Sequence, residues 1–179
     1  MHAAVRSLVL AGIVLAAAGC GSSGSSSTSS TESWANSLCS AVTTYDTALK
    51  AAGSSLQSSG ISESSLRRAV GDVNDATDTF ISSLKGLGKP DTAAGAQAKD
   101  SVDALTSQLQ QDASSIRTAT ADVSTLSGAL TAAVSVTATA SGASTQITDT
   151  WNSLQQLDAK GELSQAFSNA QSCTSLKGK

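Results

Sequence analysis

Residues 62–90 read SESSLRRAVGDVNDATDTFISSLKGLGKP, and this stretch decides the fold. Its apolar positions recur at steps of three and four, which is the spacing of residues on one buried face of a helix. These positions are Leu66, Val70, Val73, Thr77, Phe80, Leu84 and Leu87. Ser62 and Glu63 are typical of a helix start, and the two Gly and the Pro of residues 86–90 are typical of a helix end. The stretch therefore predicts one long amphipathic helix with its own start and stop signals.

The same spacing appears on both sides of this stretch. A first helix is expected to end at Gly53, a third begins at Asp91, and a short last helix follows Gly161. Their apolar positions are Trp34, Leu38, Ala41, Tyr45, Ala48 and Ala52, then Ala98, Val102, Leu105, Leu109 and Ile116, and finally Leu163, Ala166, Phe167, Ala170 and Cys173. Strand-like alternation is confined to the short run 134–139. The sequence therefore predicts an all-α antiparallel bundle of about four helices plus a short C-terminal helix.

Residues 91–140 allow either one helix or two. Apolar positions seven apart run from Val102 to Thr137, which favours a single long helix. Beyond residue 120, however, the chain is filled with Ala and Thr, and a projecting arm would bury too little surface to offset its ordering entropy. We therefore expect the chain to fold back within residues 122–128. The apolar positions of the resulting fourth helix are Leu130, Ile147, Trp151, Leu154 and Leu157.

The start of the chain differs in composition from the rest. Arg6 is followed by an uncharged, apolar run over residues 7–19, which would reach only ~20 Å as a helix, less than the ~30 Å of a bilayer core. Such a run is typical of an export signal peptide. The Ser/Gly-rich stretch after it buries no apolar surface, so we expect a disordered tether. The domains expected are a signal at 1–19, the lipid-bearing Cys and tether at 20–33, and the bundle at 34–176.

The signal ends in Ala17-Ala18-Gly19-Cys20, which resembles the bacterial lipobox, where small residues directly precede a Cys. The alternative is an ordinary secretory signal with a stray Cys. The resemblance implies cleavage before Cys20 and a lipid on its sulfur. That lipid would hold the protein on the extracytoplasmic face of the cell membrane. Ala17 departs from the pattern, because Leu is commonest there.

Cys39 and Cys173 remain once Cys20 carries a lipid, and an exported protein meets oxidising conditions. We expect the two to form a disulfide, which closes a long loop and would contribute ~4–5 kcal/mol in the chain-entropy model. Two unpaired thiols, or a bond to another chain, are the alternatives. Counting residues from each turn brings both cysteines to a similar level of the third helix. That level is compatible with either topology of residues 91–140.

A second resemblance concerns the bundle itself. Trp34 and Cys39 near its start, with the pairs 162–163 and 166–167 and Cys173 near its end, are similar to a pattern in small secreted or lipid-anchored helical proteins of high-GC bacteria. The resemblance covers most of the mature chain. It implies the helical fold and the disulfide, and it implies no activity.

The composition argues against most catalytic chemistry. The one histidine, His2, would leave with the signal, so the mature chain would have no Ser-His or Cys-His nucleophile and no His metal ligand. We expect no catalytic residue, no cofactor and no metal site. The formal charge is −3 and the basic residues are scattered, which argues against nucleic acid as a partner.

The carboxylates are the remaining candidates for chemistry. Three lie three residues apart on the second helix (Asp72, Asp75 and Asp78), and Asp100 and Asp103 lie on the third. They could hold a cation, but they fall between the apolar positions, so we expect a solvated face. Asp112 instead falls in the apolar phase of the third helix. It needs a partner such as Arg117 or a neighbouring helix if it is buried, and we favour its reaching water.

Residues 123–148 carry no charge, so they form either bundle interior or a contact surface, to be tested at Ala132 and Ala140. The function favoured is a non-catalytic, membrane-tethered extracytoplasmic module that binds an envelope protein or a wall polymer. One alternative is a small-molecule carrier with an apolar cavity lined by Trp34, Phe80 or Trp151. The other is a hydrolase that uses carboxylates alone.

Overall fold

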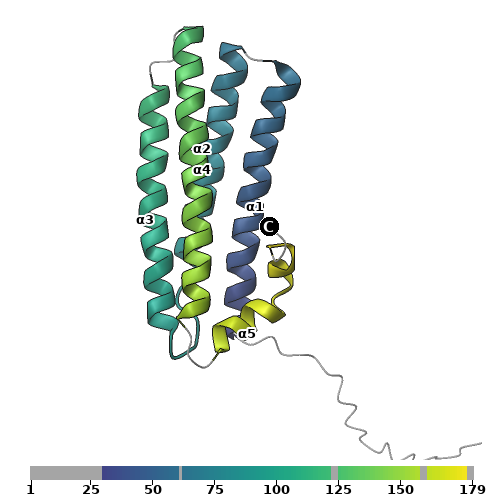
Figure 1. The fold of residues 1–179 in the computed structure, drawn as a ribbon, viewed down its shortest axis with the longest axis vertical. Coiled ribbons are helices and arrows are strands. Elements are labelled where there is room, and N and C mark those ends of the chain that lie inside the picture. The colour runs from purple at the N-terminus through teal and green to yellow at the C-terminus, as the bar shows by residue number, and fades with distance from the viewer. Residues whose placement is uncertain (1–29, 61, 122–124, 158–160, 177–179) are drawn as a thin grey trace, which may run out of the picture.

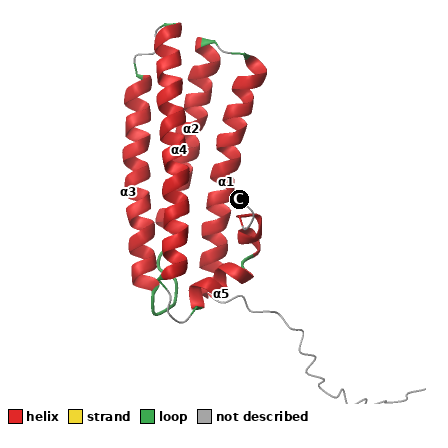
Figure 2. Ribbon diagram, viewed as in Figure 1, coloured by secondary structure: helices red, strands yellow, loops and turns green. Residues whose placement is uncertain are grey.

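The structure, a computed structural model, describes residues 30–60, 62–121, 125–157 and 161–176. Every regular element in these ranges is helical (Figure 2). The elements are α1 (Ser30–Ser59), α2 (Glu63–Gly86), α3 (Gly95–Thr120), α4 (Leu126–Gln156), α5 (Glu162–Asn169) and the 3-10 helix η1 (Gln171–Leu176). Four long helices stand side by side, and α5 crosses the end at which α1 begins and α4 finishes (Figure 1). The predicted antiparallel bundle with a short C-terminal helix is confirmed.

Local signals account for the bounds of α2. Ser62 caps its first turn, since Ser65 N donates to Ser62 Oγ at 3.2 Å and Ser62 N donates to Ser65 Oγ at 2.9 Å. The helix ends at Gly86, and Gly88 adopts a left-handed backbone with φ of 63°. The neighbouring α1 runs on past Gly53 to Ser59, so its predicted end was too early.

The chain folds back between α3 and α4, and the predicted pair of helices is confirmed. Thr125 caps α4, because its hydroxyl accepts from Gly128 N at 3.1 Å. The apolar positions spaced seven residues apart in α3 do not continue on the buried face of α4. Leu130, expected inside, is 45% exposed. Small side chains face the interior instead, namely Ala129, Ala132, Val136 and Ala143.

The start of α1 corrects the predicted tether. Residues 30–33 are helical, and Thr31 is buried, with its hydroxyl donating to Asp91 O at 3.2 Å. Trp34 Nε1 donates to Gly88 O at 3.2 Å, so the first turns of α1 fix the loop between α2 and α3. The polar Thr31 side chain is buried here together with its hydrogen bond, so its hydroxyl keeps a partner. Residues 1–29, which include Cys20, lie outside the described residues. None of the described helices is long and apolar enough to cross a membrane.

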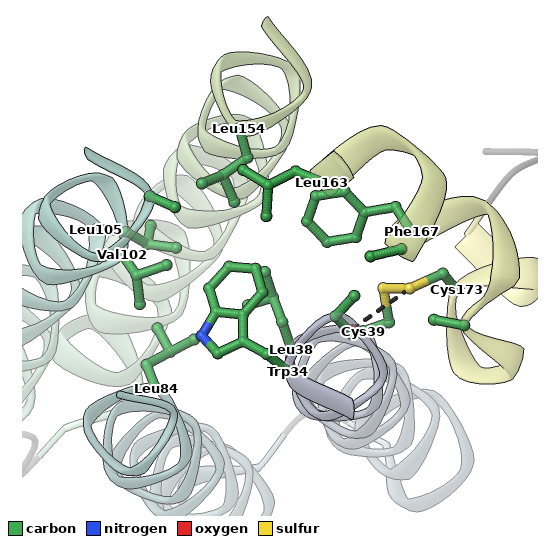
Figure 3. Close-up of a cluster of buried hydrophobic side chains, with 14 of the residues drawn as sticks. Trp34, Leu38, Cys39, Leu84, Val102, Leu105, Leu154, Leu163, Phe167 and Cys173 are labelled. Carbon is green, nitrogen blue, oxygen red and sulfur yellow. Dashed lines mark hydrogen bonds between the residues drawn. A yellow bond between two sulfur atoms is a disulfide. The ribbon is translucent and has the colours of Figure 1, made fainter. Parts of the chain in front are cut away.

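The core has a larger and a smaller part. The larger part gathers bulky side chains from all five α-helices around Trp34 (Figure 3). The smaller part holds Ala52, Val73, Ile116 and Val136. Cys39 and Cys173 form the predicted disulfide, with 5.0 Å between their Cα atoms, and both are fully buried. Cys173 lies in η1 rather than in the last α-helix, so the bond ties η1 to α1.

Candidate functional site

The ring of four long helices is open on one side. Helix α1 packs along α2, and α3 packs against both α2 and α4. Among the long helices, α4 otherwise packs diagonally on α2, whereas α1 and α4 rarely approach each other. A seam therefore runs between α1 and α4.

Helix α5 explains why this seam stays open. Its side chains Leu163 and Phe167 lie between Leu154 of α4 and Cys39 of α1 (Figure 3). The Phe167 ring contacts Trp151 of α4, with centroids 4.5 Å apart and planes inclined by 48°. These rings occupy the seam at the α5 end, because interiors pack densely and two helices cannot close over an inserted aromatic layer.

Beyond the rings the seam forms a groove of about 620 Å³. Its apolar lining comes from α1, α3, α4, α5 and η1 and consists of Leu38, Val42, Leu49, Leu105, Ile147, Trp151, Leu154, Phe167 and Leu176. The stretches of α1 and α4 that line it each span ~16 Å at ~1.5 Å per residue. Beyond its far end, Ala52 of α1 and Val136 of α4 belong to the smaller core cluster. The site is thus an elongated slot whose size suits a small-molecule ligand.

The polar lining of this groove is almost uncharged. Hydroxyls and amides contribute to it, from Ser144, Thr148, Thr150, Asn152, Gln155, Ser164 and Ser168. The one carboxylate is that of Asp46, which receives a hydrogen bond from Lys50 Nζ at 2.7 Å. Among the described residues that line the groove, none is Lys or Arg. The groove therefore offers apolar contact and neutral hydrogen-bonding groups.

A second groove, of about 680 Å³, lies between α1 and α2. Asp72 and Asp75 line it together with hydroxyl and alanine side chains. Tyr45 lines both grooves, and its ring stacks on Phe80 with centroids 4.7 Å apart. Burial raises the pKa of Tyr45. The side-chain hydrogen bond with Thr77, whose hydroxyl can turn to donate to the phenolate, acts in the opposite sense, and the charge of Asp112 adds to the rise.

The predicted carboxylates are exposed, and of these only Asp72 and Asp75 line a common groove among the described residues. Asp72, Asp75, Asp78, Asp100 and Asp103 are all exposed, as expected of a solvated face. Asp78 accepts from Arg117 Nη2 at 2.6 Å, and Asp103 pairs with Lys99 on its own helix. The described residues include no group of three potential metal ligands.

Asp112 was expected to reach water, and the structure exposes it only in part. It is half-buried, and its Oδ2 accepts from Gln146 Nε2 on α4 at 3.1 Å. Gln108 Nε2 donates to the other carboxylate oxygen at 3.4 Å. Arg117, the partner considered from the sequence, binds Asp78 instead.

The other candidate residues are divided between core and surface. Of the three aromatics proposed to line a cavity, Trp151 lines the α1–α4 groove, Phe80 lies in the core and lines the groove between α1 and α2, and Trp34 is 5% exposed in the core. The uncharged stretch has both an interior and an exposed side, since Ala132 is 2% exposed and Val134 is 70% exposed. Ala132 therefore cannot probe a contact surface.

Sequence reasoning missed Phe167 and Leu176 as groove residues. Both were visible as apolar positions near the C-terminus, but their place against the seam depends on contacts between distant segments, among them the Cys39–Cys173 disulfide and the hydrogen bond from Ser172 N to Asn36 Oδ1.

Comparison with known proteins gives no match: no family model fits the chain, and no curated protein or solved structure is significantly similar to it.

Proposed function

We propose that this chain is a non-catalytic binding module that takes an apolar molecule into the groove between α1 and α4. The observation that carries the proposal is the groove itself, a slot with an apolar wall and neutral polar groups. This favours the carrier among the functions considered from the sequence, because a slot of this size encloses a small ligand better than it fits an extended polymer.

The carboxylates support a binding role. A carboxylate hydrolase needs two acids that converge on one substrate bond. Here Asp78 is engaged by Arg117, and Asp112 is held between Gln108 and Gln146. Asp72 and Asp75 both line the groove between α1 and α2, but they lie three residues apart on the same face of α2 and are exposed, so they do not converge from opposite sides on one substrate bond.

The proposal includes the anchor. On this proposal, a lipid on Cys20 holds the module on the outer face of the cell membrane. Membrane lipids would then lie near the groove as apolar ligands. The intact mass of the protein from its membrane fraction, before and after reduction and alkylation, tests this part. Acyl mass on Cys20, with Cys39 and Cys173 alkylated only after reduction, is expected. An unlipidated mature chain would contradict the anchor and leave the groove untouched.

Binding can be tested with a neutral apolar dye, N-phenyl-1-naphthylamine, whose fluorescence rises in apolar surroundings. The protein used begins at residue 21, because this chain keeps every described helix, the core and the disulfide. Ile147→Glu places a charge in the groove and is expected to weaken dye binding about tenfold or more. Val134→Glu makes a similar change on the exposed side of the same helix and serves as the control. Equal binding by both variants and the parent would refute the proposal.

A further inference from the structure

We infer that the ligand class of the α1–α4 groove is a single-chain lipid with an uncharged or zwitterionic head group. This inference rests on the proposed function and adds the chemistry of the occupant. The hydrocarbon chain lies along the slot against its apolar wall, and the head group contacts the neutral polar side chains that line it.

The shape of the slot favours one hydrocarbon chain. It follows α1 from Leu38 to Leu49 and α4 from Ser144 to Gln155. At ~16 Å it accommodates an extended chain of about a dozen carbons, given carbon–carbon bonds of ~1.5 Å. At the α5 end the slot is lined by Phe167 and Leu176 together with the hydroxyls of Ser164 and Ser168.

The polar groups of the slot favour a head group without net charge. Seven neutral hydroxyl and amide side chains line it, and the Asp46 carboxylate is engaged by Lys50. A lone carboxylate or phosphate monoester would lose hydration without meeting a cationic partner among these residues. A glycerol or phosphocholine head avoids that cost, because the first is neutral and the second carries its own counter-charge.

A chain-length series tests the class. Lysophosphatidylcholines with 8 to about 16 acyl carbons are added as monomers, below their micelle concentrations, and displacement of the dye is measured on the chain from residue 21. While the slot fills, each added methylene is expected to strengthen binding about fourfold, since burial of a CH₂ is nearly constant. The gain is expected to stop near a dozen carbons. If binding continued to strengthen at every chain length, the site would be an open apolar surface, and the inference would be overturned.

A filling variant tests the location. Thr148 is exposed and lines the slot, so Thr148→Trp fills space without removing a core contact. With this variant, binding is expected to stop strengthening at a shorter acyl chain than in the parent. Val134→Glu should leave the dependence on chain length unchanged. Thr148→Trp also serves if Ile147→Glu folds poorly.

The outcomes separate the two proposals. If the dye binds in the groove and lysophosphatidylcholine never displaces it, the lipid class is wrong and the binding module stands. If neither groove variant changes dye binding, the proposed function itself fails. If lipidated protein from membranes binds neither probe while the unlipidated chain binds both, the protein's own lipid fills the groove and a free lipid is the wrong source.

Discussion

Asp112 of α3 accepts a hydrogen bond from Gln146 of α4, with 3.1 Å between Oδ2 and Nε2. On the other two long helices, the Tyr45 hydroxyl lies 3.3 Å from Thr77 Oγ1. Thr77 donates its own proton to Val73 O at 2.7 Å, so Tyr45 is the donor in this pair. Each long helix thus supplies one polar side chain near the boundary between the two parts of the core. Sliding one helix past another would separate these partners inside the bundle, so the pairs favour a single register.

Gln146→Glu is expected to destabilise the bundle by about 1–2 kcal/mol at neutral pH, because Asp112 loses a donor and gains a like charge. The two carboxylates would then share a proton as the pH falls. Protonation is favoured in the folded variant, so the lost stability should return in acid. Urea unfolding at several pH values measures this effect.

Gln110→Glu is the matched control, since Gln110 is exposed on α3. It adds the same charge and should change the free energy of unfolding little. An equal loss in both variants would mean that net charge, rather than the contact between α3 and α4, is responsible.

Tyr45 should titrate above the ordinary tyrosine value, because burial raises its pKa. The folded state favours the neutral phenol, so its contribution to stability is complete below about pH 10 and is lost as the pH rises through the folded pKa. Tyr45 is the one tyrosine of the chain, so ultraviolet absorbance of the phenolate follows this group alone. The same titration in denaturant gives the unfolded reference. Tyr45→Phe should remove part of the alkaline loss of stability, and an identical pH profile would show that Tyr45 does not contribute.

Removing the disulfide should cost about 2–5 kcal/mol, since the bond closes a loop across nearly the whole bundle. The variant carries Cys39→Ala and Cys173→Ala together, because a single change leaves a buried free thiol. It should also bind the apolar dye more weakly, since η1 and α5 supply part of the groove wall. Denaturant unfolding with and without reductant measures the stability. Reductant should lower the midpoint of the parent and leave the double variant unchanged.

The helices were predictable wherever local signals were strong, and the groove was not. Ser62 and the glycines near Pro90 mark the ends of α2 in the sequence itself. The disulfide could be predicted because only two cysteines, Cys39 and Cys173, lie outside the expected signal and lipidation site. The phase of α4 could not be read in the same way. A turn resets the helical phase, which is why Leu130 is exposed despite its spacing from α3.

The groove depends on a relationship between distant segments. It exists because Phe167 of α5 contacts Trp151 of α4 between α1 and α4. The spacing of apolar residues within a single helix cannot predict this contact between two helices. The specific partner of Asp112 could not be predicted for a similar reason. Its partner Gln146 lies on another helix, so the spacing of residues around Asp112 could not reveal it.

Gly95 is expected to tolerate no side chain, whereas a Cβ at Gly53, Gly71, Gly86 or Gly142 would meet nothing within 4 Å. A Cβ at this position would lie 2.1 Å from Pro90 O, a backbone atom held in the turn by a hydrogen bond from Thr92 N. Gly95→Ala must therefore shift the loop on which α1 packs through Trp34, at a cost of about 1–3 kcal/mol. Gly53→Ala is the matched control, because nothing lies within 4 Å of a Cβ there and alanine should stabilise α1 by about 0.5–1 kcal/mol. Thermal unfolding of the two variants should thus shift in opposite directions from the parent. A Gly95→Ala variant as stable as the parent would show that the turn at Pro90 can relax without disturbing the bundle.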